Sequence, residues 1–249
     1  MQYGCLPEAL DDEQIDDYLV GMAKRSNAPS KTSFKHTVYG LRFYFKLLGF
    51  TDRIVNLPSI HKAQTLPIVF SKDECRQLFK SPTLLKHRVL LSFIYSAGIR
   101  VSEVCNMHIS DVDFDRMQVY IRQGKGQKDR YVPLSTYMKT GLQKYLQSEC
   151  PQRYLFEGKT LGTPSSVRAV QWLMRETLKK TGISKQGACV HTLRHSYATH
   201  LLEDGVNIMQ IKNLLGHNNI DTTMRYLHVI QPSHQAVHSP LDTLYAPKA

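Results

Sequence analysis

The sequence predicts a mainly α-helical protein with a small antiparallel β-sheet, an α+β fold organised in two parts. Apolar residues recur with a helical period in most segments of the 249-residue chain. One stretch, residues 111–134, changes to a period of two around a glycine turn. A stretch with a proline near each end and no periodicity, residues 57–67 (LPSIHKAQTLP), separates a short helical region, 1–56, from a longer one, 68–232.

Two helices are expected in the first region. The first, residues 8–25, places Ile15, Leu19 and Met22 inward. The second, residues 31–48, ends at Gly49 and carries its apolar stripe on Val38, Leu41, Phe45 and Leu48. Other positions of this second helix are basic, and its candidate nucleic-acid contacts are Lys31, Lys35 and Arg42. A solvated basic face is the alternative interpretation.

The charge and the cysteines limit the classes of protein. A formal net charge of +11 favours polyanionic partners, nucleic acid before an acidic membrane surface, although a merely basic protein would also fit. Five scattered cysteines without a C-x-x-C pair argue against a disulfide framework and a cysteine-rich zinc site. We therefore expect a reducing, cytoplasmic location. No run of eighteen apolar residues predicts a membrane span.

The second region opens with a series of helices and a hairpin. Ser71 and Glu74 are spaced as a capping box, and the apolar run 84–97 predicts a buried helix that Gly98 ends. Arg100 and Glu103 then open another helix, one turn apart. Residues 111–134 predict a β-hairpin with Lys125 between two glycines at its tip. Residues 135–149 and 165–182 predict amphipathic helices, and the second carries Arg168 and Arg175 as candidate DNA contacts.

Three short helices are expected between residues 190 and 229. The first carries Leu193, Tyr197 and Leu201 on one stripe and stops at Gly205. The second can be capped by Asn207 and ends at Gly216, and the third can be capped by Asp221 and holds Tyr226. After these helices the sequence predicts an irregular tail, residues 233–249, that docks on its own domain or on a neighbour.

Six polar residues of the second region, 68–232, have the chemistry that phosphoryl transfer requires: Arg100, Lys125, His191, Arg194, His217 and Tyr226. Arginine forks bind phosphate oxygens, and histidines donate hydrogen bonds or move protons near neutral pH. A lysine can protonate a leaving alkoxide, and a tyrosine surrounded by cations can serve as a nucleophile. No carboxylate set suited to magnesium stands out, so we expect no metal and no other cofactor.

Five motifs in order carry a resemblance to a known family. They are YSAGIRVSE around Arg100, GKGQKDRYVPL around Lys125, HTLRHSYATHLL from His191, LLGH ending at His217, and TTMRY ending at Tyr226. Together they strongly resemble the tyrosine recombinase, or phage integrase-like, family over roughly residues 60–232. Residues 1–56 resemble a shortened form of that family's helical core-binding (SAM-like) domain, about one helix short of the usual bundle of four.

The resemblance implies a mechanism. Tyr226 would attack a DNA phosphate to give a 3′-phosphotyrosyl bond, while Arg100 and Arg194 clamp that phosphate. Lys125 would protonate the leaving oxygen, His191 would assist proton movement at the nucleophile, and His217 would hydrogen-bond the phosphate. Glu103 would support the site from behind these groups. The resemblance also implies duplex DNA as substrate, a homotetramer on two duplexes, no ATP, and, from the Xer-like HSPLD, a tail exchanged between protomers.

Three other interpretations stay open from the residues. A metal hydrolase could use His191, His195 and His200, of which the first two have a ligand-like spacing; otherwise His195 and His200 are helix-surface or packed histidines. A DNA-binding accessory factor without catalysis would fit the charge. A type IB topoisomerase would use a similar set of residues.

Overall fold

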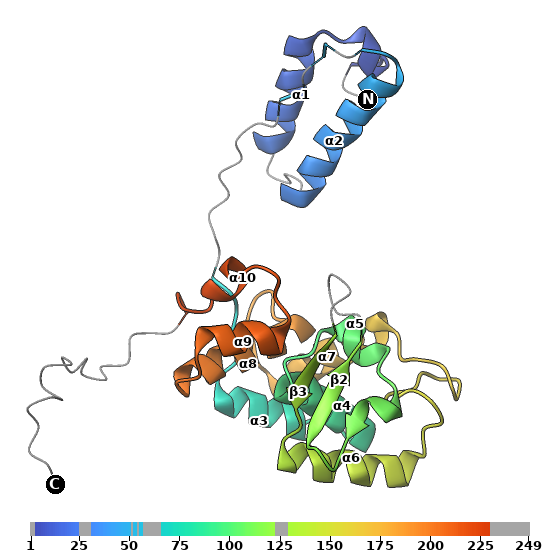
Figure 1. Cartoon of the computed structure of the whole chain (residues 1–249), viewed down its shortest axis with the longest axis vertical. Helices are drawn as coiled ribbons and strands as arrows, with labels where there is room; N and C mark the ends of the chain where they lie inside the picture. Colours follow the sequence, from blue (N-terminus) through green and yellow to red (C-terminus); the bar gives the residue numbers. More distant parts are fainter. Residues whose placement is uncertain are drawn as a thin grey trace, which may run out of the picture. The chain divides into compact units, whose positions relative to one another are not determined.

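The computed structural model describes residues 3–24, 31–50, 52–53, 55–56, 66–122 and 129–229. The chain divides into two compact units, Met1–Thr65 and Leu66–Ala249 (Figure 1). The predicted tail, and all of the predicted linker except its last two residues, lie outside the described part. No helix in that part is long and apolar enough to cross a membrane.

The first unit is a pair of helices with its own core. After a 3-10 turn, η1 (Pro7–Ala9), α1 (Asp12–Lys24) and α2 (Lys31–Leu47) lie side by side (Figure 1). The predicted inward residues Ile15, Leu19, Val38 and Phe45 are buried. The prediction for Leu48 is wrong: its side chain is 48% exposed, because α2 ends one residue earlier and the helical stripe does not continue into the turn.

The second unit is mainly helical, and α4 (Leu85–Ser96) lies in its core. α3 (Lys72–Lys80), α6 (Thr136–Glu149) and α8 (Val190–Glu203) pack against it. The predicted capping box is confirmed, since the Ser71 side chain accepts from the Glu74 amide and Glu74 accepts from that of Ser71. α7 (Val167–Thr181) packs against α3, α5 and α8. A short turn after α4 leads to α5 (Val101–Cys105).

A small antiparallel sheet lies beside these helices. Its strands are β1 (Val112–Asp113), β2 (Gln118–Ile121) and β3 (Arg130–Pro133), in the order β1-β2-β3, and β1 follows the 3-10 turn η2 (Ile109–Asp111). Val119 faces Val132, and both are buried, which confirms the predicted period-two pairing. The hairpin tip, residues 123–128, lies outside the described residues.

Three short helices end the described chain, as predicted: α8, α9 (Ile208–Leu215) and α10 (Asp221–Met224). Asn207 caps α9 by accepting from the Met209 amide. Two details of the prediction are wrong. Asp221 is the first residue of α10 and not its cap, and Tyr226 lies in the turn that follows, because α10 ends after a single turn.

Candidate active site

Arg194 is a buried cation that backbone carbonyls hold in place. Its side chain projects from α8, and the residue is 1% exposed. Nη1 donates to the Gly98 carbonyl at 2.6 Å, and Nη2 donates to the Leu215 carbonyl at 2.5 Å. Among the described residues, no carboxylate forms an ion pair with it. Burial, followed by repulsion from Arg100, lowers the pKa of Arg194 to about 9, so this position favours an anionic partner.

Arg100 reaches the same end of α9 from the start of α5. Its Nη2 lies 3.4 Å from the Gly216 carbonyl, next to the Leu215 carbonyl that Arg194 binds. Its Nη1 donates to Glu103 Oε1 at 2.7 Å, which orients the guanidinium. The two predicted arginines therefore converge on neighbouring carbonyls, from elements about a hundred residues apart in sequence.

Glu103 and Arg130 support this arrangement from behind. Arg130 on β3 donates to both Glu103 oxygens, at 3.0 and 2.7 Å, and to the Leu214 carbonyl at 3.0 Å. Burial alone would raise the pKa of Glu103, but Arg130 and then Arg100 outweigh it and lower that pKa to about 2. Arg130 was missed as a site residue. Its place opposite Ile121 follows from the register of β2 and β3, which the sequence pattern alone does not give.

His217 connects Arg194 to α10, the short helix that precedes Tyr226. Arg194 Nη2 lies 3.1 Å from His217 Nε2, and because a guanidinium only donates, Nε2 is the acceptor. The proton therefore sits on Nδ1, which donates to Thr223 Oγ1 at 2.9 Å. Burial, with the nearby arginines, lowers the pKa of His217 to about 3, which agrees with this neutral tautomer. His217 holds the Arg194 guanidinium in this structure.

Tyr226 lies against these groups, with its hydroxyl bound by His195, for which the sequence predicted no contact with the tyrosine. Its ring is 1% exposed and stacks on His217 at 6.4 Å between ring centroids. The hydroxyl is 2.9 Å from His195 Nδ1. His191, one turn earlier on α8, meets the His195 ring edge-on at 4.8 Å. The sequence contained the signal for His195 in the spacing of four from His191, but that spacing suggested only a metal or a packed residue.

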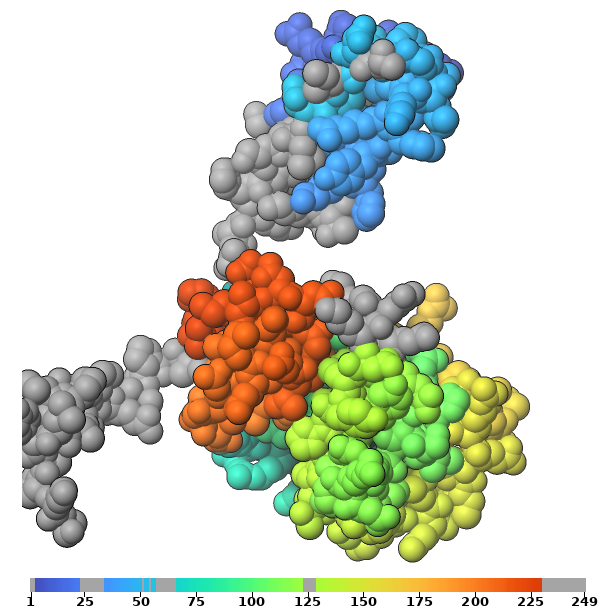
Figure 2. Space-filling model, viewed as in Figure 1, coloured from blue at the N-terminus to red at the C-terminus, as the bar shows by residue number. Residues whose placement is uncertain are grey.

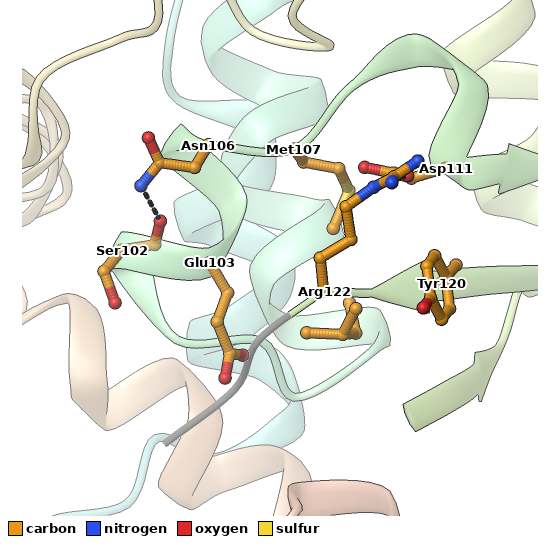
Figure 3. Close-up of a pocket in the computed structure, with 8 residues that line it drawn as sticks. Ser102, Glu103, Asn106, Met107, Asp111, Tyr120 and Arg122 are labelled. Atoms are coloured by element: carbon orange, nitrogen blue, oxygen red, sulfur yellow. Dashed lines mark hydrogen bonds and ion pairs between the residues drawn. The ribbon is translucent and has the colours of Figure 1, made fainter. Parts of the chain in front are cut away.

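Figure 2 shows the segments of this site together on one face, with α9 and α10 in orange to red beside the green strands and α5. A hollow of about 420 Å³ lies between α5 and β2, lined by Glu103, Asp111, Tyr120 and Arg122 among others (Figure 3). Arg122 pairs with Asp111 there at 2.6 Å. Of the residues described above, only Glu103 lines it, so the hollow is separate from the site around Arg194 and Tyr226.

Lys125 and the candidate DNA contacts are the remaining residues predicted from the sequence, and they differ in their environments. Lys125 lies outside the described residues, and so does the side chain of Lys31. Arg42 is bound within its own unit, since its Nε and Nη2 donate to the Val55 carbonyl at 2.9 and 2.8 Å. Lys35 is half-buried. Arg168 and Arg175 are exposed on α7, on either side of the exposed Trp172.

The three histidines of the metal-hydrolase interpretation are not gathered around one point. His195 Nδ1 is bound to Tyr226, and His200 Nδ1 is bound to the Tyr95 hydroxyl at 2.8 Å. In the part of the chain that the structure describes, no three His, Cys, Asp or Glu side chains form a group that could hold a metal ion. All five cysteines lie in that part, and all five are free.

Comparison with known proteins gives the same family as the motifs. The sequence model of the Phage integrase family matches residues 69–232. The tyrosine recombinase XerA of Thermococcus kodakarensis is 37% identical over 82% of this chain and 73% of its own length. A tyrosine recombinase of Thermosipho africanus is 34% identical over 88% of this chain and 81% of its own.

Comparison with solved structures agrees with the family found from the sequence. A crystal structure of XerA recombinase is 28% identical, covers 98% of this chain and 86% of its own, and superposes with a TM-score of 0.62. A lambda integrase dimer bound to a COC′ core site is 20% identical, covers 90% of this chain and 67% of its own, and has a TM-score of 0.73; this likeness concerns the fold alone. The comparisons favour a recombinase over a topoisomerase or an accessory factor. The chain belongs to the phage integrase family of tyrosine recombinases and is a site-specific recombinase.

Proposed function

We propose that this recombinase cuts and rejoins duplex DNA through a 3′-phosphotyrosyl intermediate on Tyr226, without metal or ATP. One observation carries the proposal. The buried Arg194 guanidinium, held by carbonyls and His217, converges with Arg100 beside the Tyr226 ring. A phosphodiester supplies the anion that this position favours, and phosphoryl transfer depends mainly on such charge stabilisation and positioning.

The reaction follows from these positions. The Tyr226 oxygen forms a bond to phosphorus while the bond from phosphorus to the 5′-oxygen breaks. The tyrosine loses its proton, and the leaving 5′-oxygen takes one up, from Lys125 in the role that the family resemblance gives it. Arg100 and Arg194 bind the non-bridging oxygens. The phosphotyrosyl ester keeps the energy of the broken bond, so rejoining consumes no ATP.

His217 and Glu103 support these groups. His217 orients Arg194 through Nε2. It becomes a donor to the phosphate when the negative charge of the DNA raises its pKa and it takes up a proton from solvent. His191 lies one turn from Arg194 and assists proton movement. Glu103 fixes Arg100 through a 2.7 Å hydrogen bond. The exposed arginines of α7, Arg168 and Arg175, contact the duplex, with Lys31, Lys35 and Arg42 of the first unit as further candidates.

The proposed assembly is four copies on two duplexes, with residues 233–249 of each copy docking on a neighbour. Solved structures with this fold include recombinases bound to DNA, among them XerH on its difH substrate. Mass measurement of the protein on a recovered target site would test this. A complex that never exceeds one protein per duplex would contradict the assembly but not the chemistry.

The experiment uses randomly nicked fragments of the genome that encodes the chain. A strand cut near a nick loses its short 5′-hydroxyl piece, so the covalent complex accumulates and survives denaturation in SDS. We expect an SDS-stable DNA complex with the wild type, also in the presence of EDTA, and none with Tyr226→Phe. DNA binding of Tyr226→Phe should stay within about twofold, because the lost hydroxyl contributes no charge to phosphate binding.

The outcomes separate the alternatives. Covalent complexes that persist in Tyr226→Phe would show that another residue is the nucleophile. Loss of cleavage in EDTA would favour metal-dependent hydrolysis. Relaxation of supercoiled DNA without exchange of strands between two duplexes would favour a topoisomerase. Sequencing the DNA attached to the wild type identifies the target site and supplies the substrate for the experiments below.

A further inference from the structure

His195 contacts the atom that reacts. Its Nδ1 is 2.9 Å from the Tyr226 hydroxyl, and the two rings lie 5.6 Å apart at an angle of 54°. His191, to which the resemblance assigns proton movement at the nucleophile, contacts the His195 ring instead. Among the described side chains, His195 is the group hydrogen-bonded to the Tyr226 hydroxyl.

We propose that His195 is a catalytic residue of strand cleavage, whose Nδ1 accepts the Tyr226 proton as the phenolic oxygen attacks phosphorus. The inference rests on the proposed function and adds to it the group that activates the nucleophile. In the cleavage step the proton moves from the Tyr226 oxygen to Nδ1, and the oxygen–phosphorus bond forms. In the rejoining step the same proton returns to the tyrosine as that bond breaks, so His195 ends each cycle neutral.

The surroundings of Tyr226 call for such a base. Burial raises the pKa of Tyr226, and although Arg194, Arg225 and Arg100 oppose this effect, the net direction is upward. The phenol is therefore a weak nucleophile at neutral pH until a neighbour takes its proton. A base in hydrogen-bond contact meets the geometric condition for general base catalysis before any movement of the site.

His195 is in the right protonation state to act. Burial, followed by His191, Arg225 and Arg194, lowers the pKa of His195 to about 4, so its imidazole is neutral at pH 7 and has a lone pair to accept with. These groups come from α8 and from the turn after α10, and His217 stacks on the Tyr226 ring. A bound phosphodiester adds a negative charge that offsets the arginines, and this raises the basicity of His195 in the complex.

Two other roles for this contact make different predictions. If His195 only positions the phenol, a hydrogen-bonding side chain that cannot take up a proton should serve equally well. If His195 instead restrains the tyrosine until DNA binds, its removal should accelerate cleavage. His195 and Arg194 are successive residues of α8, so the proposed base and the phosphate-binding group belong to the same helix.

The test uses His195→Asn, whose amide reaches roughly the position of Nδ1 and hydrogen-bonds there but is not a base. The substrate is a synthetic nicked duplex of the recovered target site, made in two versions. One carries the natural 5′-oxygen at the cut phosphate, and the other carries sulfur there, which leaves without a proton. We expect His195→Asn to form the covalent complex on the order of 10²-fold more slowly on both versions.

The pH profile and a matched control complete the design. The wild-type rate should fall as the pH drops below the pKa of His195 in the complex, and His195→Asn should lack that fall. His200→Asn removes a second His–Tyr hydrogen bond on the same helix, from Nδ1 to the Tyr95 hydroxyl at 2.8 Å, away from the arginines. We expect it to retain the wild-type cleavage rate, while melting temperatures and DNA binding report folding for all variants.

Three results would overturn the assignment. His195→Asn could cleave within threefold of the wild type, which indicates positioning alone, or faster, which indicates a restraint. The substrate with sulfur at the leaving position could restore the cleavage rate of His195→Asn fully, which would place its proton transfer at the leaving group. That restoration is the result we expect for Lys125→Ala. If the wild type forms no covalent complex on any DNA, the proposed function itself fails.

Discussion

Two arginine side chains of the site, those of Arg130 and Arg194, are largely covered, and their charge is balanced in different ways. Arg130 is paired with both oxygens of Glu103, whereas Arg194 is held by two carbonyls and a neutral histidine. Glu103 is also the partner of Arg100, so one carboxylate pairs with two of the three clustered guanidinium groups. The excess of positive charge is what a DNA phosphate would offset, so we expect the phosphate to bind beside Arg194.

The balanced part of this cluster makes a pH-dependent contribution to stability. The pKa of Glu103 falls from 4.5 to about 2 on folding, so its ionised form stabilises the protein fully above pH 4.5, and that contribution is lost as the pH falls towards 2. We expect Glu103→Gln to lower the free energy of unfolding by about 3 kcal/mol at pH 7. The difference from wild type should shrink between pH 4.5 and pH 3. Urea unfolding followed by circular dichroism measures both.

Asp73→Asn is the matched control, because it breaks an exposed pair with Arg76 in which the side chains are 81% and 67% exposed. We expect it to change the unfolding free energy by less than about 0.5 kcal/mol at any pH. A Glu103→Gln variant as stable as this control at pH 7 would mean that the buried ion cluster does not stabilise the fold.

At the scale of elements, the turn between α4 and α5 brings the site together. Gly98 has φ +58°, and its carbonyl accepts from Arg194. A Cβ on Gly98 would lie 2.4 Å from Tyr197 Cδ1 and 3.1 Å from Leu215 Cδ2. The turn is therefore packed against α8 and α9 so closely that only glycine fits, and the same close packing positions its carbonyl for Arg194.

Gly98→Ala should destabilise the protein by about 2–4 kcal/mol, since it combines overpacking with an unfavourable backbone conformation. The folded fraction should also form less of the covalent complex, because Tyr197 and the Gly98 carbonyl must shift. Gly205→Ala is the control: φ is +83°, but nothing lies within 4 Å of the added carbon. We expect a loss of about 1 kcal/mol and unchanged cleavage. Equal effects of the two variants would contradict the packing argument.

Helices and strands were largely predictable, because apolar period and capping are local properties. The Ser71 capping box, the α4 run and the Val119–Val132 pairing follow directly from the residues around them. The failures occur where an element ends, as at Leu48, or where a helix is only one turn long, as at Asp221. At such points tertiary packing decides the last residue, and the sequence pattern contains too few turns to show it.

The sequence predicted which residues form most of the site, but not which of them contact one another. Motif order selected Arg100, Arg194, His217 and Tyr226, and the structure brings these four together. The bonds from Arg130 to Glu103 and from His195 to Tyr226 join segments that are 27 and 31 residues apart. Side-chain direction across such distances depends on the packed fold, which local patterns do not specify.

For the whole molecule, the net charge of +11 should govern DNA affinity. Binding that neutralises phosphates releases counterions, so affinity should fall steeply with salt. We expect the double variant Arg168→Ala, Arg175→Ala to reduce the slope of log affinity against log salt by about 2, with binding weakened across all DNA sequences. Fluorescence anisotropy with a labelled duplex at several salt concentrations measures this.

The control removes two arginines that already have carboxylate partners, Arg76 and Arg116, which pair with Asp73 and Asp113. This double variant has the same net charge as the first, but we expect its slope to stay within about 0.5 of wild type. Equal slopes for the two double variants would assign the effect to total charge and exclude a specific contact by α7.

The burial of Tyr226, the proposed nucleophile, has a consequence for cleavage at wrong DNA sites. The protein meets very many wrong phosphodiesters for each correct one, and a tyrosine at 1% exposure cannot attack those it passes. We therefore expect cleavage to require that bound DNA first gains access to the Tyr226 oxygen. Fidelity would then depend on two requirements, recognition of the sequence and access to this oxygen, and a chance encounter rarely satisfies both.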